Sequence, residues 1–571
     1  MSTSPDAEGD PGPSCRFWIP DRLCEPSGKE GVEVASYDYK PFAYKTPPEL
    51  RGAPSARKPV VIVGAGPVGL ACAIDLALHD VPVVVLDDAD VVSVGSRAIC
   101  WAKRTLEIFD RLGIGQRVVD KGVTWNVGRV FHGDDELYRF DLLPEPHHRR
   151  PAFVNLQQYY VEDYLVERAA DFADRIDIRW KNEVVGVAPN ANGVTVSVRT
   201  PDGDYTLEAD WILAADGARS PVRTMLSLSF EGQRFEERFL IADVCMKADY
   251  PTQRLFWFKP TFHAGESALM HRQADDVFRI DFQLGPDADP EREREPERVM
   301  ARVKAVVGDT PVELEWCSVY SFRCARLEKF VHGRVVFVGD SAHVVSPFGA
   351  RGGNGGIQDA DNLCWKLALV VKGEAPVSLI DTYDEERGHG ARENILNSSR
   401  TTNFMTPKSR TEYLFRDAVL ALAKAQPFGR TLLNAGRLSK PCALPGMSLQ
   451  TRSDATDGLA PGTACADAPV RSATGEGWLL DHLGGEFVLL SIGGSAPAIE
   501  GIRSLTVDDA ASGATLVDHL GIVRARYGAG HYLIRPDAHV AARFDLADPA
   551  AIAAALARAK GSAPKDVRAA A

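Results

Sequence analysis

The sequence predicts a mixed α/β protein in which a β-rich segment interrupts a parallel-sheet domain and a second, smaller α/β domain follows. The 571 residues suffice for two or three domains, because a single hydrophobic core stops growing at roughly 250–300 residues. Continuous apolar runs followed by glycine-rich turns indicate strands that are buried on both faces of a parallel sheet. The middle of the chain instead alternates apolar and polar residues, which is typical of antiparallel strands.

The pattern along the chain predicts an arm, two folded parts and a linker between them. Residues 1–57 are rich in Pro, Gly and charge and predict an N-terminal arm. Residues 58–405 predict the parallel-sheet domain with its insertion at about 226–330, followed by a helical linker over 406–445 and the smaller domain over 446–571. Aromatic side chains suggest that the arm wraps onto a folded surface or a neighbouring subunit; they are Phe17, Trp18, Tyr37, Tyr39, Phe42 and Tyr44.

Composition excludes several functional classes. A net charge of −13 argues against nucleic acid or an anionic membrane surface as the main partner. The sequence has no apolar run of about 18 residues and no signal-peptide pattern, so we expect a cytoplasmic protein. The ten cysteines include no Cys-x-x-Cys pair, which favours unpaired thiols in a reducing compartment over disulfides or a metal site.

The first chemical motif lies between a strand and a helix near the start of the folded part. An apolar run at 60–63 is followed by Gly-x-Gly-x-x-Gly and then by an Ala-rich helical stretch at 70–78. Gly64 permits a tight turn, Gly66 lets the backbone approach a pyrophosphate, and Gly69 lets the helix pack closely on the strand.

This motif predicts a dinucleotide whose phosphates lie against the free N–H groups at the start of the helix, where Pro67 stands. Asp87 follows the next apolar strand, at 81–86, and can accept hydrogen bonds from ribose hydroxyls. The motif by itself does not distinguish FAD from NAD.

Two later segments make that distinction. Each is a strand followed by an acidic turn: Asp216-Gly217 comes after one strand, and Gly339-Asp340 comes after another. An acid placed after a strand can bind the ribityl hydroxyls of a flavin. A glycine cluster at 352–356 then opens a helix, where backbone N–H groups can approach the edge of a flavin ring. The three segments together favour FAD.

In this order and spacing, the three segments resemble the aromatic-ring hydroxylases, single-component FAD monooxygenases related to para-hydroxybenzoate hydroxylase and phenol hydroxylase. The resemblance covers about 58–400 and includes Ser-Arg-Ala at 96–98, Arg-Thr-Leu-Glu at 104–107 and the helix around 359–367. It implies a Rossmann-like FAD-binding domain with an inserted β-sheet substrate domain. The segment 532–537 resembles the thioredoxin-like tail domain of the phenol hydroxylase branch, here without a dithiol pair and therefore expected to serve packing or homodimerisation.

The resemblance also implies roles for individual residues. Arg97 would contact FAD near the pyrophosphate, and Gln158, or Gln157 if the register slips by one, would face the ribityl chain. Asp216 would support the nucleotide and the loop that contacts NADPH, and Asp340 would bind the ribityl chain. The complete predicted cofactor-binding set is Gly64, Gly66, Pro67, Gly69, Asp87, Arg97, Gln158, Asp216, Gly339, Asp340, Pro347, Gly352, Gly353 and Asn354.

The sequence departs from the family in the predicted active-site loop, where the family often has two prolines and this chain has Ser346-Pro347. Pro347 keeps the turn. Ser346 adds a hydroxyl near the expected active site, although a turn serine commonly bonds its own backbone. His343 is expected to be a structural, hydrogen-bonding histidine, and the pattern identifies no catalytic base.

The resemblance implies that NADPH or NADH reduces FAD, that O₂ adds at the flavin C4a, and that the hydroperoxide oxygenates a phenolic ring. We therefore predict a monooxygenase of phenols, in aromatic catabolism as with 3-(3-hydroxyphenyl)propionate or substituted phenols. The alternatives are a tailoring hydroxylase of aromatic polyketides, a flavin dehydrogenase that does not use O₂, and a non-catalytic dinucleotide-binding protein. Possible anchors for a substrate carboxylate, each more typically ion-paired, are Arg254, His271, Arg272, Arg279 and Arg323.

Overall fold

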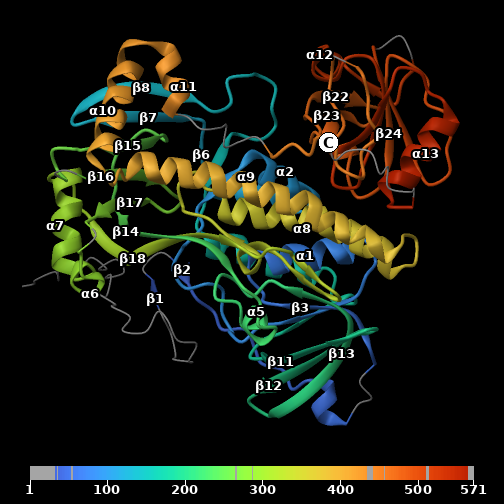
Figure 1. Ribbon diagram of the computed structural model, residues 1–571, viewed down its shortest axis with the longest axis horizontal. Helices are drawn as coiled ribbons and strands as arrows, with labels where there is room; N and C mark the ends of the chain where they lie inside the picture. Colours follow the sequence, from blue (N-terminus) through green and yellow to red (C-terminus); the bar gives the residue numbers. More distant parts are fainter. Residues whose placement is uncertain are drawn as a thin grey trace, which may run out of the picture.

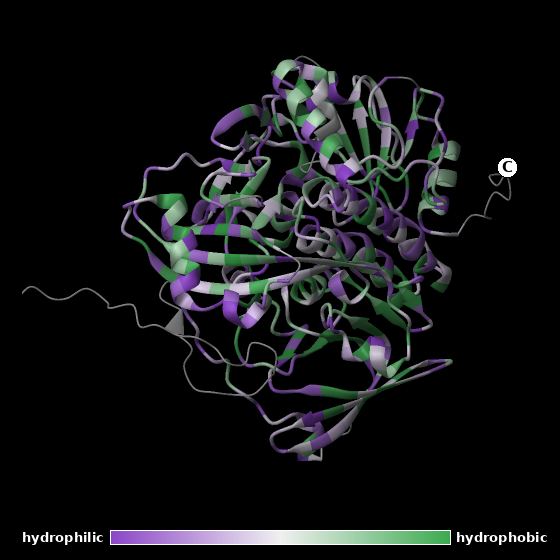
Figure 2. Cartoon of the chain, turned by 60° about the vertical axis from the view of Figure 1, so that its left-hand side comes forward, coloured by the Kyte–Doolittle hydropathy of each residue, from purple (hydrophilic) through white to green (hydrophobic). Residues whose placement is uncertain are grey.

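The computed structural model describes residues 33–34, 37–52, 56–263, 266–285, 287–433, 441–455, 457–509 and 513–562. The predictions for Phe17 and Trp18 lie outside these residues. In the described part of the chain, no helix combines the length and the apolar character needed to cross a membrane. Figure 2 shows hydrophobic residues along many strands and along the helices that face them, and hydrophilic residues in many outer loops.

The first domain is built on an eight-stranded sheet in which apolar strands run parallel at the centre (Figure 1). The strands β10, β4, β3, β13 and β20 are parallel to one another, and β13, β12 and β11 form the antiparallel side predicted from the alternation. The strands are β3 (Lys58–Val63), β4 (Val83–Leu86), β10 (Ile176–Arg179), β11 (Glu183–Asn190), β12 (Gly193–Thr200), β13 (Gly203–Ala214), β19 (Val331–His332) and β20 (Val335–Phe337).

Helices bury the apolar faces of this sheet and form the largest core of the molecule. Helix α1 packs against both α4 and α8. The glycine turn before α1, the Gln158 end of α4 and the glycine cluster at the start of α8 therefore belong to helices of one layer. The helices are α1 (Pro67–Leu78), α2 (Lys103–Leu112), α3 (Gly115–Lys121), α4 (Gln158–Ala170), α5 (Pro221–Met225), α8 (Gly352–Val371) and α9 (Asp381–Met405), with 3₁₀ turns η1 (Pro48–Arg51), η2 (Gly339–Ser341) and η3 (Val377–Leu379). A small sheet joins β5 (Cys100–Ala102), β9 (Phe153–Asn155) and β6 (Val123–Trp125).

A second eight-stranded sheet stands beside the first, in the order β21-β18-β14-β17-β16-β15-β7-β8. Helix α7 (Pro296–Val307) covers one of its faces with an apolar core, and α6 (Pro290–Glu293) precedes it. The strands are β7 (Val127–His132), β8 (Asp135–Asp141), β14 (Glu231–Cys245), β15 (Arg254–Phe258), β16 (Ser267–Arg272), β17 (Val277–Leu284), β18 (Glu313–Arg326) and β21 (His343–Val344).

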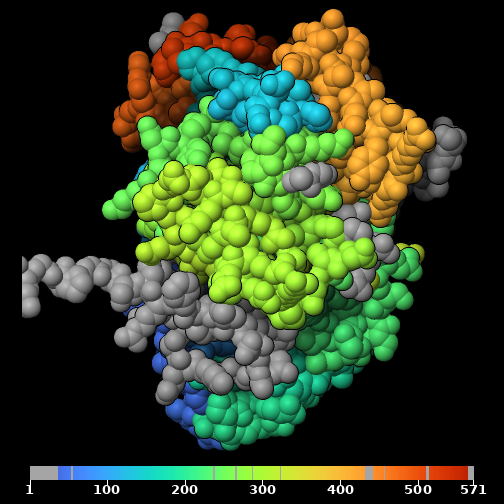
Figure 3. Space-filling view, turned by 90° about the vertical axis from the view of Figure 1, so that its left-hand side faces the viewer, coloured from blue at the N-terminus to red at the C-terminus, as the bar shows by residue number. Residues whose placement is uncertain are grey.

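This sheet extends beyond the predicted insertion at about 226–330. Strands β7 and β8 come from 127–141, because β15 recruits β7 as a parallel neighbour at the edge of the sheet. The helices α10 (Arg410–Ala425) and α11 (Pro427–Leu433) lie in the segment predicted as a helical linker. In Figure 3 the cyan β7–β8 segment lies between the red C-terminal domain and the orange α10–α11 pair. Arg149 accordingly bonds Asp481, and Lys424 bonds Asp135 at 2.9 Å.

The C-terminal domain is a seven-stranded mixed sheet in the order β23-β22-β26-β25-β24-β27-β28. Its elements are β22 (Pro469–Ser472), β23 (Gly475–Trp478), η4 (Leu479–His482), β24 (Val488–Ile492), β25 (Arg503–Asp508), β26 (Leu516–Val517), α12 (Ile522–Tyr527), β27 (Gly530–Ile534), β28 (Val540–Phe544) and α13 (Pro549–Ala559). The predicted mixed α/β class is confirmed. The likeness of this domain to thioredoxin stays a prediction.

Buried ion pairs attach the C-terminal domain to the first domain. Arg535, which follows β27, donates to both carboxylate oxygens of Glu386 on α9 at 2.6 and 2.9 Å, and also bonds Asp537. Lys366 on α8 donates to Glu386 at 2.8 Å, and none of these side chains has exposed surface. The sequence motif at 532–537 therefore serves to dock the tail domain in this structure.

The described part of the N-terminal arm lies on the first domain. Tyr37 and Tyr39 pack among the rings of Tyr159 and Tyr160, and Phe42 stacks on Trp180 with a centroid distance of 4.3 Å. A short hairpin joins β1 (Glu33–Val34) to β2 (Tyr37–Asp38). The Tyr39 hydroxyl accepts a hydrogen bond from the N–H of Gly95 at 3.1 Å, so the arm supports the segment that carries Arg97.

Candidate active site

The three predicted motifs meet at one edge of the first sheet. Strands β3, β13 and β20 are parallel neighbours, so the segments that follow them begin at the same edge. These segments are the glycine turn at 64–69, the Asp216-Gly217 turn and the Gly339-Asp340 turn. The carboxyl ends of parallel strands are where open α/β sheets bind their ligands, so the site lies at the expected edge.

The glycines of the first motif have separable roles. Gly64 has a φ of +104°, and a Cβ placed on it would lie 2.6 Å from the carbonyl oxygen of Ala215. A Cβ on Gly69 would lie 2.0 Å from the carbonyl oxygen of Gly64, so both positions require glycine for packing. A Cβ on Gly66 would meet no atom within 4 Å. The space beside Gly66, at the start of α1, is therefore open to a bound phosphate.

Asp87 holds the glycine turn in place. Its carboxylate accepts hydrogen bonds from the N–H groups of Ala65 at 2.5 Å and Ala89 at 2.9 Å. Burial raises the pKa of Asp87 to about 6, and these two hydrogen bonds act against that shift. Because each carboxylate oxygen has two lone pairs, Asp87 keeps capacity for a ribose hydroxyl.

The segment that carries Arg97 is anchored from two sides. Arg279 of the second sheet donates to the carbonyl oxygen of Ser96 and to that of Arg97. Gln158, the first residue of α4, accepts from the N–H of Ala98 at 3.1 Å, so its amide faces this segment. The Arg97 side chain is exposed and makes no hydrogen bond or ion pair with the described residues, which leaves it available to an anionic ligand.

The Gln157 alternative faces elsewhere. Its amide nitrogen donates to the carbonyl oxygen of Ala274 at 3.1 Å, inside the interface with the second sheet. Its carbonyl oxygen is buried without a hydrogen-bond partner. Gln158 lies closer than Gln157 to the segment of Arg97.

The turn after β13 contains an unmatched carboxylate oxygen. One oxygen of Asp216 accepts from the Ser220 hydroxyl at 2.8 Å and from the N–H of Val222 at 2.9 Å. The other oxygen is buried and has no partner, and burial raises the pKa of Asp216. Arg223 ties this turn to the next one by donating to the carbonyl oxygen of Ser341 at 2.9 Å. An orphaned carboxylate oxygen at this edge fits a hydroxyl donor of a nucleotide.

The Gly339-Asp340 turn is braced from beneath. The N–H of Gly339 donates to Asp359 at 3.0 Å, and the same carboxylate binds His343 at 2.7 Å and Arg387 at 2.6 Å. His343 is thus engaged in a buried ion-pair network, as expected for a structural histidine. The Asp340 side chain makes no hydrogen bond with the described residues. Desolvation by the surrounding protein raises the pKa of Asp340, and the nearby His343 and Arg97 act against this shift.

The loop predicted to flank the flavin edge presents Pro347 but not Ser346. Pro347 is exposed, whereas the Ser346 hydroxyl is buried against α9, 2.6 Å from the hydroxyl of Ser398 and 2.8 Å from that of Thr402. The expectation that Ser346 adds a hydroxyl near the active site is therefore wrong. The reason is that α9 supplies partners for this hydroxyl, which sequence reasoning could not place beside the loop.

The glycine cluster forms the first turn of α8, beginning at Gly352. The amide of Asn354 is fully engaged: it accepts from the N–H of Ala102 at 2.8 Å and donates to the carbonyl oxygens of Cys100 and Ala350. Its side chain therefore fixes the turn, and only backbone groups here are free for a cofactor. Gly353 lies in the same turn, where an added Cβ would approach Ala98 to 3.4 Å.

These observations fit the predicted FAD. The donor and acceptor set consists of the open start of α1, the unpaired charges of Arg97 and Asp340, and the orphaned oxygen of Asp216. Phosphates, ribityl hydroxyls and ribose hydroxyls require that combination of a cation, helix N–H groups and carboxylates.

The second sheet turns a partly polar face toward this site. Its opposite face is covered by α7, and side chains alternate along each strand, so Arg279 points toward the first domain. Phe239 of β14 lies on the same side and packs edge-on against Phe348 of the Pro347 loop, with centroids 5.0 Å apart. This contact brings the Pro347 loop against that face of the second sheet.

The five predicted carboxylate anchors behave differently from one another. Arg272 pairs with Asp276 at 3.2 Å, Arg323 donates to a backbone carbonyl, and Arg279 pairs with Asp243 at 2.7 Å. His271 is buried, and its pKa is well below the usual value because burial disfavours its charged form. Arg254 alone makes no hydrogen bond or ion pair with any residue that the structure describes.

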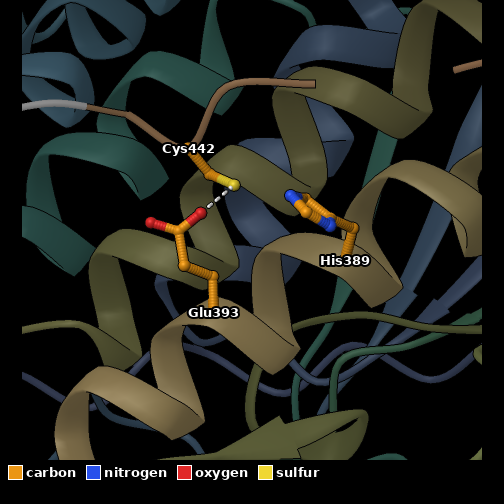
Figure 4. Close-up of side chains that lie close together, drawn as sticks. All are labelled: His389, Glu393 and Cys442. Carbon is orange, nitrogen blue, oxygen red and sulfur yellow. Dashed lines mark hydrogen bonds between the residues drawn. The ribbon is translucent and has the colours of Figure 1, made fainter. Parts of the chain in front are cut away.

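A side-chain cluster outside this site has a structural explanation. His389 and Glu393, one turn apart on α9, and Cys442 of the following segment place their polar atoms within 4.8 Å of one another (Figure 4). The Cys442 thiol donates to Glu393 at 2.8 Å, and burial raises its pKa to about 12. This contact holds the segment that leads to the C-terminal domain against α9.

Comparison with known proteins gives a consistent result. A family described as "FAD binding domain" matches residues 57–398. The chain is 33% identical over 354 residues to a flavin-dependent monooxygenase of Mycobacteroides abscessus, which spans 57% of this chain and 70% of that protein. It is 31% identical to the 3-(3-hydroxy-phenyl)propionate/3-hydroxycinnamic acid hydroxylase of Burkholderia cenocepacia over 65% of this chain and 68% of that protein.

A further relative matches nearly end to end. The 6-methylpretetramide 4-monooxygenase of Streptomyces rimosus is 30% identical over 551 residues, which is 87% of this chain and 92% of that protein. Among solved structures, the flavin-dependent monooxygenase PieE with FAD and substrate superimposes with a TM-score of 0.77 at 23% identity, over 90% of this chain and 100% of that one. Aklavinone-11 hydroxylase with FAD and aklavinone gives a TM-score of 0.71 at 23% identity, over 88% and 99%.

Proposed function

The chain belongs to the FAD-binding-domain family and is an FAD-dependent aromatic hydroxylase, and on that premise we propose that it hydroxylates a phenolic substrate with NADPH or NADH and O₂. The observation that supports this proposal is the meeting of the glycine turn, Asp216 and Asp340 at one sheet edge, opposite an aromatic-lined face of the second sheet. FAD, when bound, supplies the redox chemistry that transfers one oxygen atom of O₂ to the ring.

The residues of the chain bind FAD, orient the substrate and shield the reaction from water. We propose that the start of α1 and Arg97 hold the pyrophosphate, while Asp87 takes the ribose hydroxyls. Asp340 takes the ribityl hydroxyls, and the first turn of α8 presents backbone N–H groups to the ring edge. Phe239 and Phe348 close an apolar side of the substrate space and exclude water, which prevents wasteful release of hydrogen peroxide.

Two classes of phenol are candidate substrates: aromatic polyketides and the simple phenols of aromatic catabolism. One observation favours the polyketides. The propionate hydroxylase of B. cenocepacia aligns over about two thirds of this chain, whereas the 6-methylpretetramide monooxygenase aligns over 87%, a share that has to include part of the C-terminal domain. We therefore rank tailoring of a polycyclic aromatic polyketide ahead of the simple phenols of aromatic catabolism.

The experiment is a substrate panel with the purified holoenzyme. NADPH and NADH oxidation, O₂ uptake and product mass are followed with simple phenols, hydroxyphenylpropionates and polycyclic phenols. We expect a product heavier by one oxygen atom and faster oxidation with polycyclic phenols. A protein that stays colourless after addition of FAD would refute the proposal. Electron transfer without O₂ uptake would favour the dehydrogenase alternative. The predicted homodimer and cytoplasmic location are tested separately by light scattering and cell fractionation.

A further inference from the structure

We propose that Arg254 and Asp281 form the subsite that receives the phenolic hydroxyl of the substrate, and that this pair selects uncharged phenols over phenols carrying a nearby carboxylate. Asp281 accepts the phenolic proton, and Arg254 stabilises the phenolate. The O–H bond of the phenol breaks, its electron pair stays on the phenolate oxygen, and the proton moves to the Asp281 carboxylate. This inference rests on the proposed function and names the polar groups that would carry it out.

Both side chains lie on the face of the second sheet that is turned toward the first domain. Along β17, Phe278, Ile280 and Phe282 belong to the core under α7, so Asp281 points the opposite way, as Arg279 does. Along β15, Leu255 belongs to the same core, which places Arg254 on the face of Asp281.

Neighbouring strands complete this face. Strand β16 lies between β15 and β17 and pairs His271 with Arg279 and Leu269 with Asp281. A cavity of about 250 Å³, lined in part by Trp125, Thr252 and Gln253, lies next to the start of β15.

Arg279 and Gln283, two positions before and after Asp281 on β17, are already matched. Arg279 is paired with Asp243 at 2.7 Å, and the side chain of Gln283 accepts from the Ser267 hydroxyl at 2.7 Å. By contrast, one carboxylate oxygen of Asp281 is buried without a hydrogen-bond partner. Buried polar atoms without partners are rare in folded proteins, and a catalytic or binding role is one explanation for them.

Arg254 and Asp281 act on each other electrostatically without forming an ion pair. A group that both donates and accepts hydrogen bonds would satisfy both: a hydroxyl can donate to the carboxylate and accept from the guanidinium. A substrate carboxylate could satisfy only Arg254 and would be repelled by Asp281. The charges of these four side chains also balance, because the two arginines, Arg254 and Arg279, are neutralised by the two aspartates, Asp243 and Asp281. Within this described group of four, no arginine is left over to compensate a substrate carboxylate.

Titration of the surrounding groups supports this assignment. Burial raises the pKa of Asp281 to about 6, Arg279 and Arg254 lower it, and Asp243 raises it. Asp281 is therefore ionised at neutral pH and more basic than an ordinary aspartate. His271 stays neutral because burial and the two arginines hold its pKa well below the usual value. Burial raises the pKa of Cys100, on β5, to about 11, so its thiol stays protonated.

The test compares Asp281→Asn with the wild-type holoenzyme, using the most active uncharged phenol of the panel. Wild-type kcat/KM should rise with pH through about 6 and then level off, because protonated Asp281 cannot accept a proton. Asp281→Asn should lose that step and about 100-fold in kcat/KM, the lower range for loss of a general base. Flavin content should not change, because Asp281 is not among the residues proposed to bind FAD. Asp281→Glu, which keeps the carboxyl group, should restore the step.

Three comparisons make the result specific. Asp276→Asn, in the adjacent turn, should behave as wild type. Arg254→Gln should weaken phenol binding, read from the absorbance change of the bound flavin, and Arg254→Lys should weaken it less. The wild type should prefer an uncharged phenol to its carboxylated counterpart by more than about tenfold, and Asp281→Asn should narrow that preference.

The results distinguish failure of the proposed function from failure of the Arg254–Asp281 subsite. If the wild type hydroxylates no phenol, the proposed function fails and this inference fails with it. If it hydroxylates phenols but Asp281→Asn keeps both the pH step and the wild-type kcat/KM, only the Arg254–Asp281 subsite is overturned. An unchanged preference between carboxylated and uncharged phenols in that variant would also overturn the selectivity.

Discussion

Replacement of Arg535 by Leu should weaken the packing of the C-terminal domain on the first domain and so lower the free energy of unfolding. Arg535 is fully buried and donates to both oxygens of Glu386, at 2.6 and 2.9 Å, and to Asp537. Leu would leave both carboxylates in the interior without their main cation. Removing one partner of a buried ion pair costs about 3–5 kcal/mol, and Lys366 still compensates Glu386, so we expect about 3 kcal/mol.

The assay is urea unfolding followed by tryptophan fluorescence, with limited proteolysis of the segment between the domains. The matched control is Arg471→Leu in the same domain, whose exposed pair with Glu476 at 3.0 Å should contribute less than about 1 kcal/mol.

The defect of Arg535→Leu should depend on pH. Burial by itself would raise the pKa of Glu386, but Arg535 and Lys366 hold it well below the ordinary 4.5. A carboxyl whose pKa is depressed on folding adds stability above its unfolded pKa and loses it in acid. The difference between wild type and Arg535→Leu should therefore be complete at pH 7 and shrink below about pH 4.5. Equal unfolding curves for Arg535→Leu and Arg471→Leu at pH 7 would show that the docking energy lies elsewhere.

The remaining predictions concern the site. Gly66→Ala should fold as wild type, because its Cβ meets no atom within 4 Å, yet retain less FAD after gel filtration; full flavin content would contradict the phosphate assignment. Gly64→Ala should lower the melting temperature even without FAD, because its Cβ would lie 2.6 Å from a carbonyl oxygen; an unchanged value would count against the packing argument. Asp340→Asn should weaken FAD binding by about 1.5–3 kcal/mol in a titration of the apoprotein, and an unchanged Kd would remove it from the cofactor site. Asp281→Asn should stabilise the protein by up to about 3 kcal/mol at pH 8 in urea, since a pKa raised from 3.8 to about 6 makes ionised Asp281 costly to the fold; the gain should vanish below pH 3.8, and no gain at pH 8 would show that the charge is well solvated.

Sequence reasoning placed the cofactor motifs better than the boundaries of the substrate sheet. The glycine turn, Asp216 and Asp340 each follow a strand of the parallel sheet, and such strands can be recognised in the sequence as short apolar runs. Strands β7 and β8 gave no comparable signal, because they join the second sheet only through the parallel pairing of β7 with β15. A pairing between segments more than a hundred residues apart leaves no local pattern in the sequence.

The same limit explains the loop residues. Ser346 and Asn354 are polar side chains beside the expected flavin edge, and the pattern alone suggested chemical contact. The structure gives both of them partners: hydroxyls of α9 for Ser346, and backbone groups of β5 and the Pro347 loop for Asn354. Which polar group stays unmatched depends on what packs against it.

The sequence by itself predicted a dinucleotide at the turn containing Gly64, Gly66 and Gly69, because the strand, the glycine spacing and the helix follow one another locally along the chain. It also determined the family, through the order and spacing of three local motifs. Only the tertiary structure decided which of the five candidate cations has no hydrogen-bond or ion-pair partner among the described residues. That distinction arises because Arg254 and Asp281 sit on different strands of one sheet face, and their unmet hydrogen bonds exist only once that sheet has formed.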